Sequence, residues 1–328
     1  MNTLKAILLG LFIPMILMSN NDRDPIKYNY LAKKEVQRFI HMMVNKYHFK
    51  RSYVTSVLKS SKLDRDTLAR YSGKFRPNTT VGSWERFKRN VVNEKTFKKA
   101  RAFKKEHYKT LKKAQKHYKV DMNYIVGFLG VESQFGTYTG DYNILDALAT
   151  LAFHPNRMKK LFKSEIKHLF LFARDKGHDI TKLEGSFAGA MGCVQQLPSI
   201  ARKFNYDFDG DGASVWDIED CIGSIAKFMH KNKWRKGAIT AVSTKYNSGN
   251  RFKRLKTSRK RMLSLSTIRK AGVTPLEPFP YSKAYLLKTR NKTHDDIWLG
   301  GKNFRVLTRY NNSTNYGVAI HLIAKSIQ

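Results

Sequence analysis

One glutamate stands among apolar residues in the segment Asp121–Gly136, DMNYIVGFLGVESQFG. In a helix, the residues on the same side as Glu132 would all be apolar: Ile125, Phe128, Leu129 and Phe135. A carboxyl group on a buried stripe must be paired, or must stay neutral through a raised pKa. A raised pKa suits a general acid near neutral pH, so Glu132 is the candidate catalytic residue. The alternative is a structural glutamate satisfied by a hydrogen bond or by an arginine.

No second acid lies at an informative spacing from Glu132. Asp141 and Asp146 follow in a loop and at a helix start, where helix capping is a sufficient explanation. Glycoside hydrolysis usually employs two carboxylates. If Glu132 is catalytic in such a reaction, it is expected to work without a carboxylate partner.

A glycine-rich segment, GSFAGAMGCVQQLPS (Gly185–Ser199), offers both close backbone approach and polar side chains. It lacks the lysine and hydroxyl residue of a phosphate-binding loop, which argues against nucleotide binding. Ser186, Gln195 and Gln196 could instead contact sugar hydroxyls.

An acidic loop follows at Asp207–Gly212, DFDGDG. Asp207, Asp209 and Asp211 occupy positions one, three and five of a calcium-binding loop, with glycine at position six. Position twelve is Ile218, and the acids Glu219 and Asp220 lie just beyond it. The pattern predicts structural calcium, with a plain Asp/Gly turn as the alternative.

The elements that must position these residues are mainly helical. Apolar residues recur every three or four positions from Phe97 to Tyr118, which predicts one long helix. Asp121 can cap the start of the helix that carries Glu132, and Gly136 can end it. The further helices are expected at about 123–135, 145–152, 157–176, 198–205, 221–231 and 316–327. Short β-prone runs occur at 283–288 and 303–308, so the patterns predict a mainly α protein with one small β insert.

Composition and charge limit the class of protein. The chain has 328 residues, 41% hydrophobic, and a formal net charge of +37. It can therefore form a large core, and after residue 20 no apolar run is long enough to span a bilayer. Two cysteines without a Cys-x-x-Cys motif exclude a disulfide-rich scaffold and a zinc knuckle. Eleven Lys or Arg between Lys95 and Lys119 indicate a solvated helix face or a polyanion-binding face.

The N-terminus is typical of an export signal. Lys5 precedes an apolar stretch, Ala6–Met18, and polar residues follow from Ser19. A buried first helix is the alternative, although Pro14 would break it. Residues 1–19 could be cleaved or could be retained as a membrane anchor. An exported protein with this positive charge would meet two polyanions, the cell wall and anionic lipid surfaces.

Five segments in this order resemble the lytic murein transglycosylase B family. They are IVGFLGVESQFG (Ile125–Gly136), NILDALATLAF (Asn143–Phe153), GSFAGAMG-x-x-Gln (Gly185–Gln195), DFDGDG…WDIEDCIGSIA (Asp207–Ala226) and LTRYNNSTNYGVAIHLIA (Leu307–Ala324). The resemblance implies a lysozyme-like helical core with an added N-terminal helical domain and a small β insert. The implied divisions are a signal peptide or anchor at 1–19, an N-terminal helical region at 20–79, the catalytic core with its calcium-type loop at 80–250, a small β domain at 251–306 and a returning segment at 307–328.

The same resemblance implies the activity and the site residues. It implies cleavage of peptidoglycan glycan strands between N-acetylmuramic acid and N-acetylglucosamine, with a 1,6-anhydromuramic product and Glu132 acting as acid and then as base. By position, the substrate-binding residues are Ser186, Gln195, Tyr310, Asn311 and Tyr316. The calcium ligands are Asp207, Asp209, Asp211 and Asp220, and the chemistry itself needs no cofactor. The partner is the glycan strand in the periplasm, with an anionic membrane surface or other cell-wall proteins as further candidates and no nucleic acid.

Several residues depart from the family pattern. Cys193 and Val194 stand where Tyr-Gly is expected, and Gln196 stands where Phe is expected. The calcium loop is one residue short, and Ala213 brings no side-chain ligand to it. Cys193 and Cys221 could form a disulfide in an oxidising compartment, or could remain two buried thiols. Two other functions therefore stay open, a muramidase that uses water and a wall-binding protein without turnover.

Overall fold

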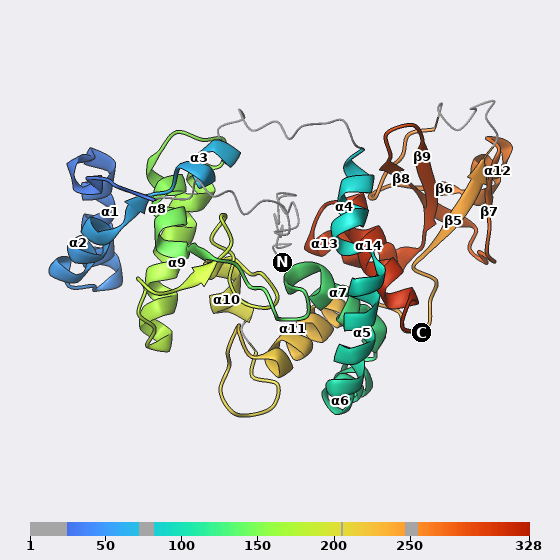
Figure 1. Cartoon of the computed structure of the whole chain (residues 1–328), viewed down its shortest axis with the longest axis horizontal. Coiled ribbons are helices and arrows are strands. Elements are labelled where there is room, and N and C mark those ends of the chain that lie inside the picture. The colour runs from blue at the N-terminus through green and yellow to red at the C-terminus, as the bar shows by residue number, and fades with distance from the viewer. Residues whose placement is uncertain (1–24, 72–81, 205, 247–254) are drawn as a thin grey trace. The chain divides into compact units, whose positions relative to one another are not determined.

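The computed structural model describes residues 25–71, 82–204, 206–246 and 255–328, which form two compact units. Among these residues, the first unit holds 82–135 and 222–328, and the second unit holds 25–71 and 136–221. Both units are mainly helical, which confirms the predicted fold class (Figure 1). The predicted signal segment 1–19 lies outside the described residues. None of the helices in the described ranges is long and apolar enough to cross a membrane.

The two units divide the chain differently from the expected domains. The expected core, 80–250, contributes to both units, and residues 25–71 of the N-terminal region belong with 136–221. Phe39 of the N-terminal region shows why, because its ring packs against Phe153 at 5.6 Å and Phe170 at 5.9 Å between centroids. The N-terminal helices thus share a hydrophobic core with part of the expected catalytic domain.

The first unit combines helices with a five-stranded antiparallel sheet. Its helices are α4 (Ser83–Val91), α5 (Glu94–Glu106), α6 (Tyr108–Tyr118), α7 (Met122–Ser133), most of α11 (Ile218–Lys231), α12 (Leu265–Lys270), α13 (Lys302–Tyr310) and α14 (Thr314–Lys325). The strands are β5 (Ala241–Tyr246), β6 (Met262–Ser264), β7 (Val273–Pro275), β8 (Lys283–Arg290) and β9 (Asp295–Gly300), in the order β6-β8-β9-β5-β7. Val242, Ile268, Leu286 and Leu299 belong to the buried core of the sheet.

Two local predictions for the first unit were wrong. The single helix expected over 97–118 is two helices, α5 and α6, which meet at His107 in a non-helical conformation (φ −97°, ψ 22°). The β-prone run 303–308 lies within α13, where Phe304 and Leu307 are buried on one side. Burial of apolar residues at helical spacing outweighs the weak β-propensity of that run.

The second unit is built on helices with two short two-stranded sheets. The helices are α1 (Lys34–Tyr47), α2 (Arg51–Ser60), α3 (Arg65–Tyr71), α8 (Ile144–Phe153), α9 (Lys159–Lys176) and α10 (Pro198–Phe204), with a 3-10 turn at Tyr30–Ala32. β1 (Ile26–Lys27) pairs with β2 (Lys62–Leu63), and β3 (Tyr142–Asn143) pairs with β4 (Glu184–Gly185). Each pair fixes a crossing between segments distant in the chain.

Helices α7 and α14 pack closely in the first unit. A Cβ at Gly127 of α7 would lie 2.7 Å from the carbonyl oxygen of Ile320, so only glycine allows this approach of α14. A hydrogen bond of 2.8 Å between the Tyr124 hydroxyl and His321 Nδ1 also joins the two helices. The residues predicted to share one side of α7 with Glu132 are buried, as expected, and the rest of the helix from Tyr124 to Ser133 is buried as well. A helix that is apolar all round is a core helix, and here it carries Glu132.

Candidate active site

Glu132 lies in the last turn of α7 with 7% of its surface exposed. Its Oε1 accepts a short hydrogen bond from the Tyr316 hydroxyl on α14. Burial raises the pKa of Glu132 to about 8, although the hydrogen bond from Tyr316 lowers this pKa relative to burial alone. Among the described residues no lysine or arginine pairs with this carboxyl. The acid is therefore held protonated at neutral pH, which is the state that a general acid requires.

An aromatic cluster surrounds this carboxyl. The rings of Tyr310 and Tyr316 lie parallel, with 6.5 Å between centroids and 4° between planes. Phe128 and Phe228 meet Tyr310 edge-on, at 5.4 and 4.9 Å. Burial, and after it the charge of Glu132, raises the pKa of Tyr316 well above its usual value, so its hydroxyl remains a donor. Such a dry aromatic environment strengthens electrostatic interactions with a reacting group.

The chain leaves α7 through a left-handed turn. Gln134, Phe135 and Gly136 have φ of 50°, 66° and 83°, and the helix ends at Ser133, before the predicted glycine stop. Left-handed backbone costs a non-glycine residue roughly 1–2 kcal/mol, and such strain is often found at functional sites. At the start of α7, Asp121 occupies the N-cap position, as predicted. Its carboxylate does not cap the helix but accepts a hydrogen bond from Trp234 Nε1 (2.7 Å).

Asn311 directly follows α13 and is buried, with 3% exposed. Neither its amide nitrogen nor its amide oxygen has a hydrogen-bond partner among the described residues. An unsatisfied buried amide costs about 1–3 kcal/mol per group, so such a side chain is a good candidate for a ligand contact. The first unit thus brings Glu132, Tyr310 and Tyr316 together, with Asn311 next to Tyr310 in the chain.

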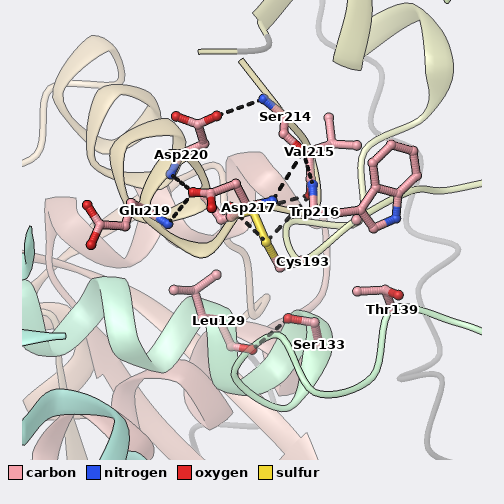
Figure 2. Close-up of a disulfide and its surroundings, with 12 residues drawn as sticks. Leu129, Ser133, Thr139, Cys193, Ser214, Val215, Trp216, Asp217, Glu219 and Asp220 are labelled. Carbon is pink, nitrogen blue, oxygen red and sulfur yellow. Dashed lines mark hydrogen bonds between the residues drawn. A yellow bond between two sulfur atoms is a disulfide. The ribbon is translucent and has the colours of Figure 1, made fainter. Parts of the chain in front are cut away.

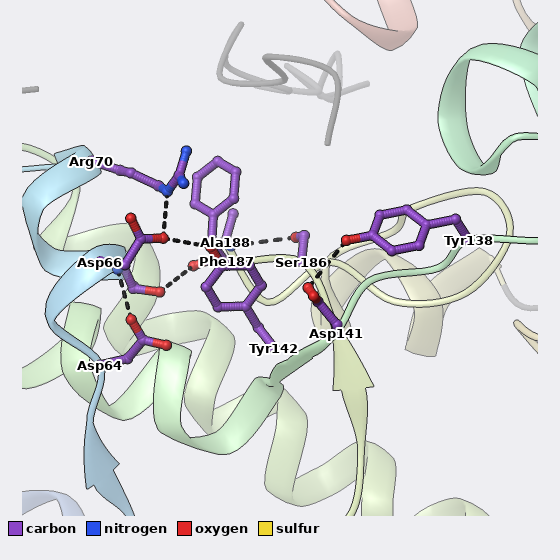
Figure 3. Close-up of polar contacts among 10 residues, drawn as sticks. Asp64, Asp66, Arg70, Tyr138, Asp141, Tyr142, Ser186, Phe187 and Ala188 are labelled. Carbon is purple, nitrogen blue, oxygen red and sulfur yellow. Dashed lines mark hydrogen bonds and ion pairs between the residues drawn. The ribbon is translucent and has the colours of Figure 1, made fainter. Parts of the chain in front are cut away.

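Ser186 and Gln195 belong to the second unit, and both are 1% exposed. The Ser186 Oγ accepts hydrogen bonds from the backbone of Ala190 (2.9 Å) and Ala188 (3.3 Å), as Figure 3 shows for Ala188. Gln195 donates from Nε2 to the carbonyls of Thr139 (2.7 Å) and Gly192 (2.9 Å). Its Oε1 is buried without a partner among the described residues, and is therefore free to accept a bond from a ligand.

A polar network in the same unit joins α3 to β3 (Figure 3). Asp66 accepts hydrogen bonds from Arg70 Nε (2.7 Å) and from the Tyr142 hydroxyl. The Arg70 guanidinium lies over the ring of Phe187, 4.9 Å from its centroid. The last contact holds the ring of Phe187, which directly follows Ser186 in the chain.

The acidic loop brings three of the four predicted calcium ligands together. One carboxylate oxygen from each of Asp207, Asp209 and Asp220 lies within 4.8 Å of the others. Asp220 also accepts from the backbone nitrogens of Phe208 (2.6 Å) and Ser214 (2.7 Å), and burial raises its pKa. Asp211 is outside this group, and the charge of Asp209 raises its pKa. Three clustered carboxylates are the oxygen ligands that calcium prefers, so the residues present fit this ion.

Cys193 and Cys221 form a disulfide, which decides between the two alternatives left by the sequence. The bond joins the loop after Gly192 to the first turn of α11, with 6.2 Å between Cα atoms (Figure 2). At Gly192 a Cβ would lie 1.9 Å from the Val215 carbonyl oxygen, so glycine is required beside the bridge. The cysteine that replaces an expected tyrosine therefore has a structural use.

Removing this disulfide is expected to destabilise the second unit by roughly 3–4 kcal/mol. The two cysteines are 28 residues apart. Closing a loop of that length restricts the unfolded chain, and the entropy that it loses corresponds to about this free energy at 25 °C. The measurement is denaturant unfolding of the double variant Cys193→Ala and Cys221→Ala. Reductant should destabilise the wild type but not this variant, and a reductant-insensitive wild type would contradict the prediction.

Sequence patterns missed Phe228, which packs edge-on against both Phe128 and Tyr310. It lies on α11, a helix that the spacing of apolar residues predicted, but nothing in the sequence indicated that this helix packs near Glu132. The contact of Phe228 with Phe128 of α7 shows that it does.

Comparisons with known proteins show the family of the chain. A family model described as a transglycosylase SLT domain matches residues 31–325. The chain is similar to membrane-bound lytic murein transglycosylase B of Escherichia coli K12, with 34% identity over 308 residues, 91% of this chain and 84% of that protein.

Solved structures show the same similarity. The Escherichia coli lytic transglycosylase Slt35 in complex with bulgecin A superimposes with a TM-score of 0.82 and 33% identity, covering 92% of this chain and 95% of that one. The same protein in complex with calcium gives a TM-score of 0.80 and 32% identity over 92% and 95% of the two chains.

Proposed function

The chain belongs to the transglycosylase SLT domain family and is a peptidoglycan lytic transglycosylase, and we propose that Glu132 is its single acid and base. The bond cleaved is the β-1,4 bond between N-acetylmuramic acid and N-acetylglucosamine. The observation that carries the proposal is the buried Glu132 carboxyl with its pKa raised to about 8 and its bond from Tyr316.

The reaction needs two proton transfers at one carboxyl. The protonated Glu132 gives its proton to the glycosidic oxygen as the bond from C1 of the muramyl sugar breaks. The resulting carboxylate then takes the proton of the muramyl 6-hydroxyl as that oxygen attacks C1. The products are a 1,6-anhydromuramyl end and a free 4-hydroxyl, with no water consumed and Glu132 protonated again. One acid suffices because it is the base of the second step.

Substrate contacts are proposed for Tyr310, Asn311, Ser186 and Gln195. The Asn311 amide and the Gln195 Oε1 have no hydrogen-bond partner among the described residues, which supports polar contacts to sugar hydroxyl or acetamido groups. For Tyr316, the hydroxyl bond to Glu132 supports a role in positioning the carboxyl in place of stacking on a sugar.

The product of the reaction tests the proposal directly. Purified protein is incubated with intact sacculi, and the released fragments are analysed by mass spectrometry. Anhydromuramyl ends are expected. Reducing muramic acid ends would indicate the muramidase alternative, and binding without release would indicate a wall-binding protein without turnover.

Tyr316→Phe tests the positioning role on its own. The hydroxyl bond lowers the pKa of Glu132 relative to burial alone, so its loss should raise that pKa further. The basic limb of the pH–rate profile is then expected to move to higher pH, while the maximum rate falls through poorer orientation of the acid. An unchanged profile would show that the bond has no influence on the catalytic carboxyl.

We also propose that Asp207, Asp209 and Asp220 hold a structural calcium ion, with Asp211 as a further ligand. Their clustered carboxylates support the proposal, as does the calcium complex of Slt35. A chelator is expected to lower the melting temperature by about 5 °C or more, because a ligand present at 100 times its Kd contributes about 2.7 kcal/mol.

The calcium prediction is checked by thermal unfolding with EGTA and then with added Ca²⁺ or Mg²⁺. Calcium should restore the melting temperature, and Asp209→Asn should abolish the response. Glu184→Gln, which removes an exposed acid of the same unit, should respond like the wild type. Indifference of the wild type to EGTA would remove the idea.

Export to the periplasm remains a proposal based on the first 19 residues. The relative from Escherichia coli is named a membrane-bound enzyme, which supports retention at a membrane. Cell fractionation of the full chain and of a chain lacking residues 1–19 would distinguish a secreted from a retained protein.

A further inference from the structure

Arg259 is a partly buried arginine with neutral partners, in the loop before β6. Its Nη1 donates to Thr314 Oγ1 (3.0 Å) and its Nη2 donates to Asn312 Oδ1 (3.2 Å). The Nε group is buried and has no partner among the described residues. The guanidinium is thus held in a fixed orientation by two of its five N–H donors.

No carboxylate of the described residues pairs with Arg259. Burial, followed by the charge of Arg305, lowers the pKa of Arg259, and burial followed by the charge of Arg309 lowers that of Arg305. Of the chain's acids, only Asp22 and Asp24 lie outside the described ranges. The charge of Arg305 thus acts on Arg259, and an anion bound at Arg259 would offset the repulsion between these positive charges.

The partners of Arg259 relate it to the catalytic residues of the same unit. Asn312 and Thr314 lie in the turn between α13 and α14. Tyr310 and Asn311 come directly before Asn312 in the chain. Arg259 therefore holds the turn that presents two of the candidate substrate-contacting residues.

The same turn leads into the helix that contacts the acid. Tyr316, whose hydroxyl donates to Glu132, follows two residues after Thr314. Arg305 lies on the other side of the turn, on α13, five residues before Tyr310. The two arginines thus lie on segments that meet at the catalytic turn.

We propose that Arg259 and Arg305 form a subsite that binds a carboxylate of the peptidoglycan strand beside the catalytic turn. The proposal rests on the proposed function, and it names a group of the substrate, a carboxylate, that the chain binds in addition to the sugars. Arginine suits this role because its planar fork matches a carboxylate. Peptidoglycan offers two sources of this group, the carboxylates of the peptide stems and the lactyl carboxylate that is exposed on muramic acid once a stem has been removed.

Four substrates separate these sources. They are sacculi with intact stems, the same sacculi with their carboxylates amidated by carbodiimide and ethanolamine, glycan strands stripped of stems by an amidase, and stripped strands amidated in the same way. The measurement is kcat/KM for release of anhydromuramyl products. A charge-assisted hydrogen bond is expected to make amidation cost the wild type about tenfold or more, chiefly in KM. If amidation lowers kcat/KM for intact sacculi, the subsite binds the stem carboxylates. If amidation lowers kcat/KM only for stripped strands, the subsite binds the lactyl carboxylate.

Three variants assign the preference to the subsite. Arg305→Gln should lose most of the discrimination between native and amidated substrates, chiefly through a higher KM for the native ones. Arg259→Lys, which keeps the charge but not the fork, should lose part of it. Arg269→Gln removes an exposed charge from α12 of the same unit and should discriminate like the wild type.

The outcomes keep this proposal separate from the proposed function. If the wild type forms anhydromuramyl products equally from all four substrates, the subsite is wrong and the transglycosylase stands. The subsite is also wrong if Arg269→Gln loses as much discrimination as Arg305→Gln, because general attraction by a net charge of +37 would then explain the preference. If the wild type forms no anhydromuramyl product from any substrate, the proposed function itself fails.

Discussion

Replacing Glu132 with glutamine is expected to lower the rate of anhydromuramyl product formation by about 1,000-fold or more. General acid or base catalysis contributes roughly 100- to 10,000-fold, and here one carboxyl is proposed to serve both steps. Glutamine keeps the size of the side chain and can still accept from Tyr316, but it cannot give or take the proton. The measurement is the initial rate on intact sacculi, followed by mass spectrometry of the products.

A second buried glutamate supplies the matched control. Glu165 on α9 is 3% exposed, its pKa is raised by burial, and it accepts from the backbone nitrogen (2.9 Å) and the hydroxyl (2.7 Å) of Ser199. Glu165→Gln therefore also removes a buried acid, and it should leave kcat within a few-fold of the wild type. If Glu132→Gln kept more than a few per cent of the wild-type rate, the single-acid mechanism would be wrong.

Local patterns in the sequence were sufficient for part of this site. Glu132 could be singled out because one acid among apolar residues at helical spacing is costly wherever the helix packs. The Asp-rich loop was equally local, and the structure gathers Asp207 and Asp209 in it. Such features depend on residues within a few turns of one another.

Other features depend on contacts that no local pattern contains. Tyr316 reaches Glu132 across 184 residues of sequence, and the burial of α7 on every side depends on the approach of α14 at Gly127. The break at His107 interrupts a helical pattern that contains neither glycine nor proline, so spacing alone predicted a continuous helix. The choice between a disulfide and two thiols also required the positions of both cysteines in space.

The contribution of Glu132 to stability should fall as pH rises from about 5 to about 8, and Glu132→Gln should remove this part of the pH dependence. The folded-state pKa of Glu132 is about 8, against an ordinary value of 4.5. Between these values the folded chain holds a proton that the unfolded chain has released. The free energy of unfolding therefore decreases with rising pH, and the stabilisation present below pH 4.5 is lost as pH passes through 8.

The loss is expected to be on the order of 4 kcal/mol, because each pKa unit corresponds to about 1.4 kcal/mol. The measurement is denaturant unfolding of wild type and Glu132→Gln at several pH values, with the difference between the two proteins plotted against pH. Taking the difference cancels other titrating groups, including His321, whose pKa burial lowers to about 4. The stability of the glutamine variant relative to the wild type should increase progressively above about pH 5.

A flat difference curve would mean that the carboxyl is ionised at ordinary cost in the folded chain, and the acid role would lose its physical basis. A rising curve would tie two properties to one cause. The dry surroundings that destabilise the carboxylate in the folded protein also keep the acid protonated until it meets the glycosidic oxygen. Glu132→Gln would then lose activity and gain stability above about pH 5 for one reason, the desolvation of the carboxyl group. Such a trade of stability for function is expected at a catalytic site.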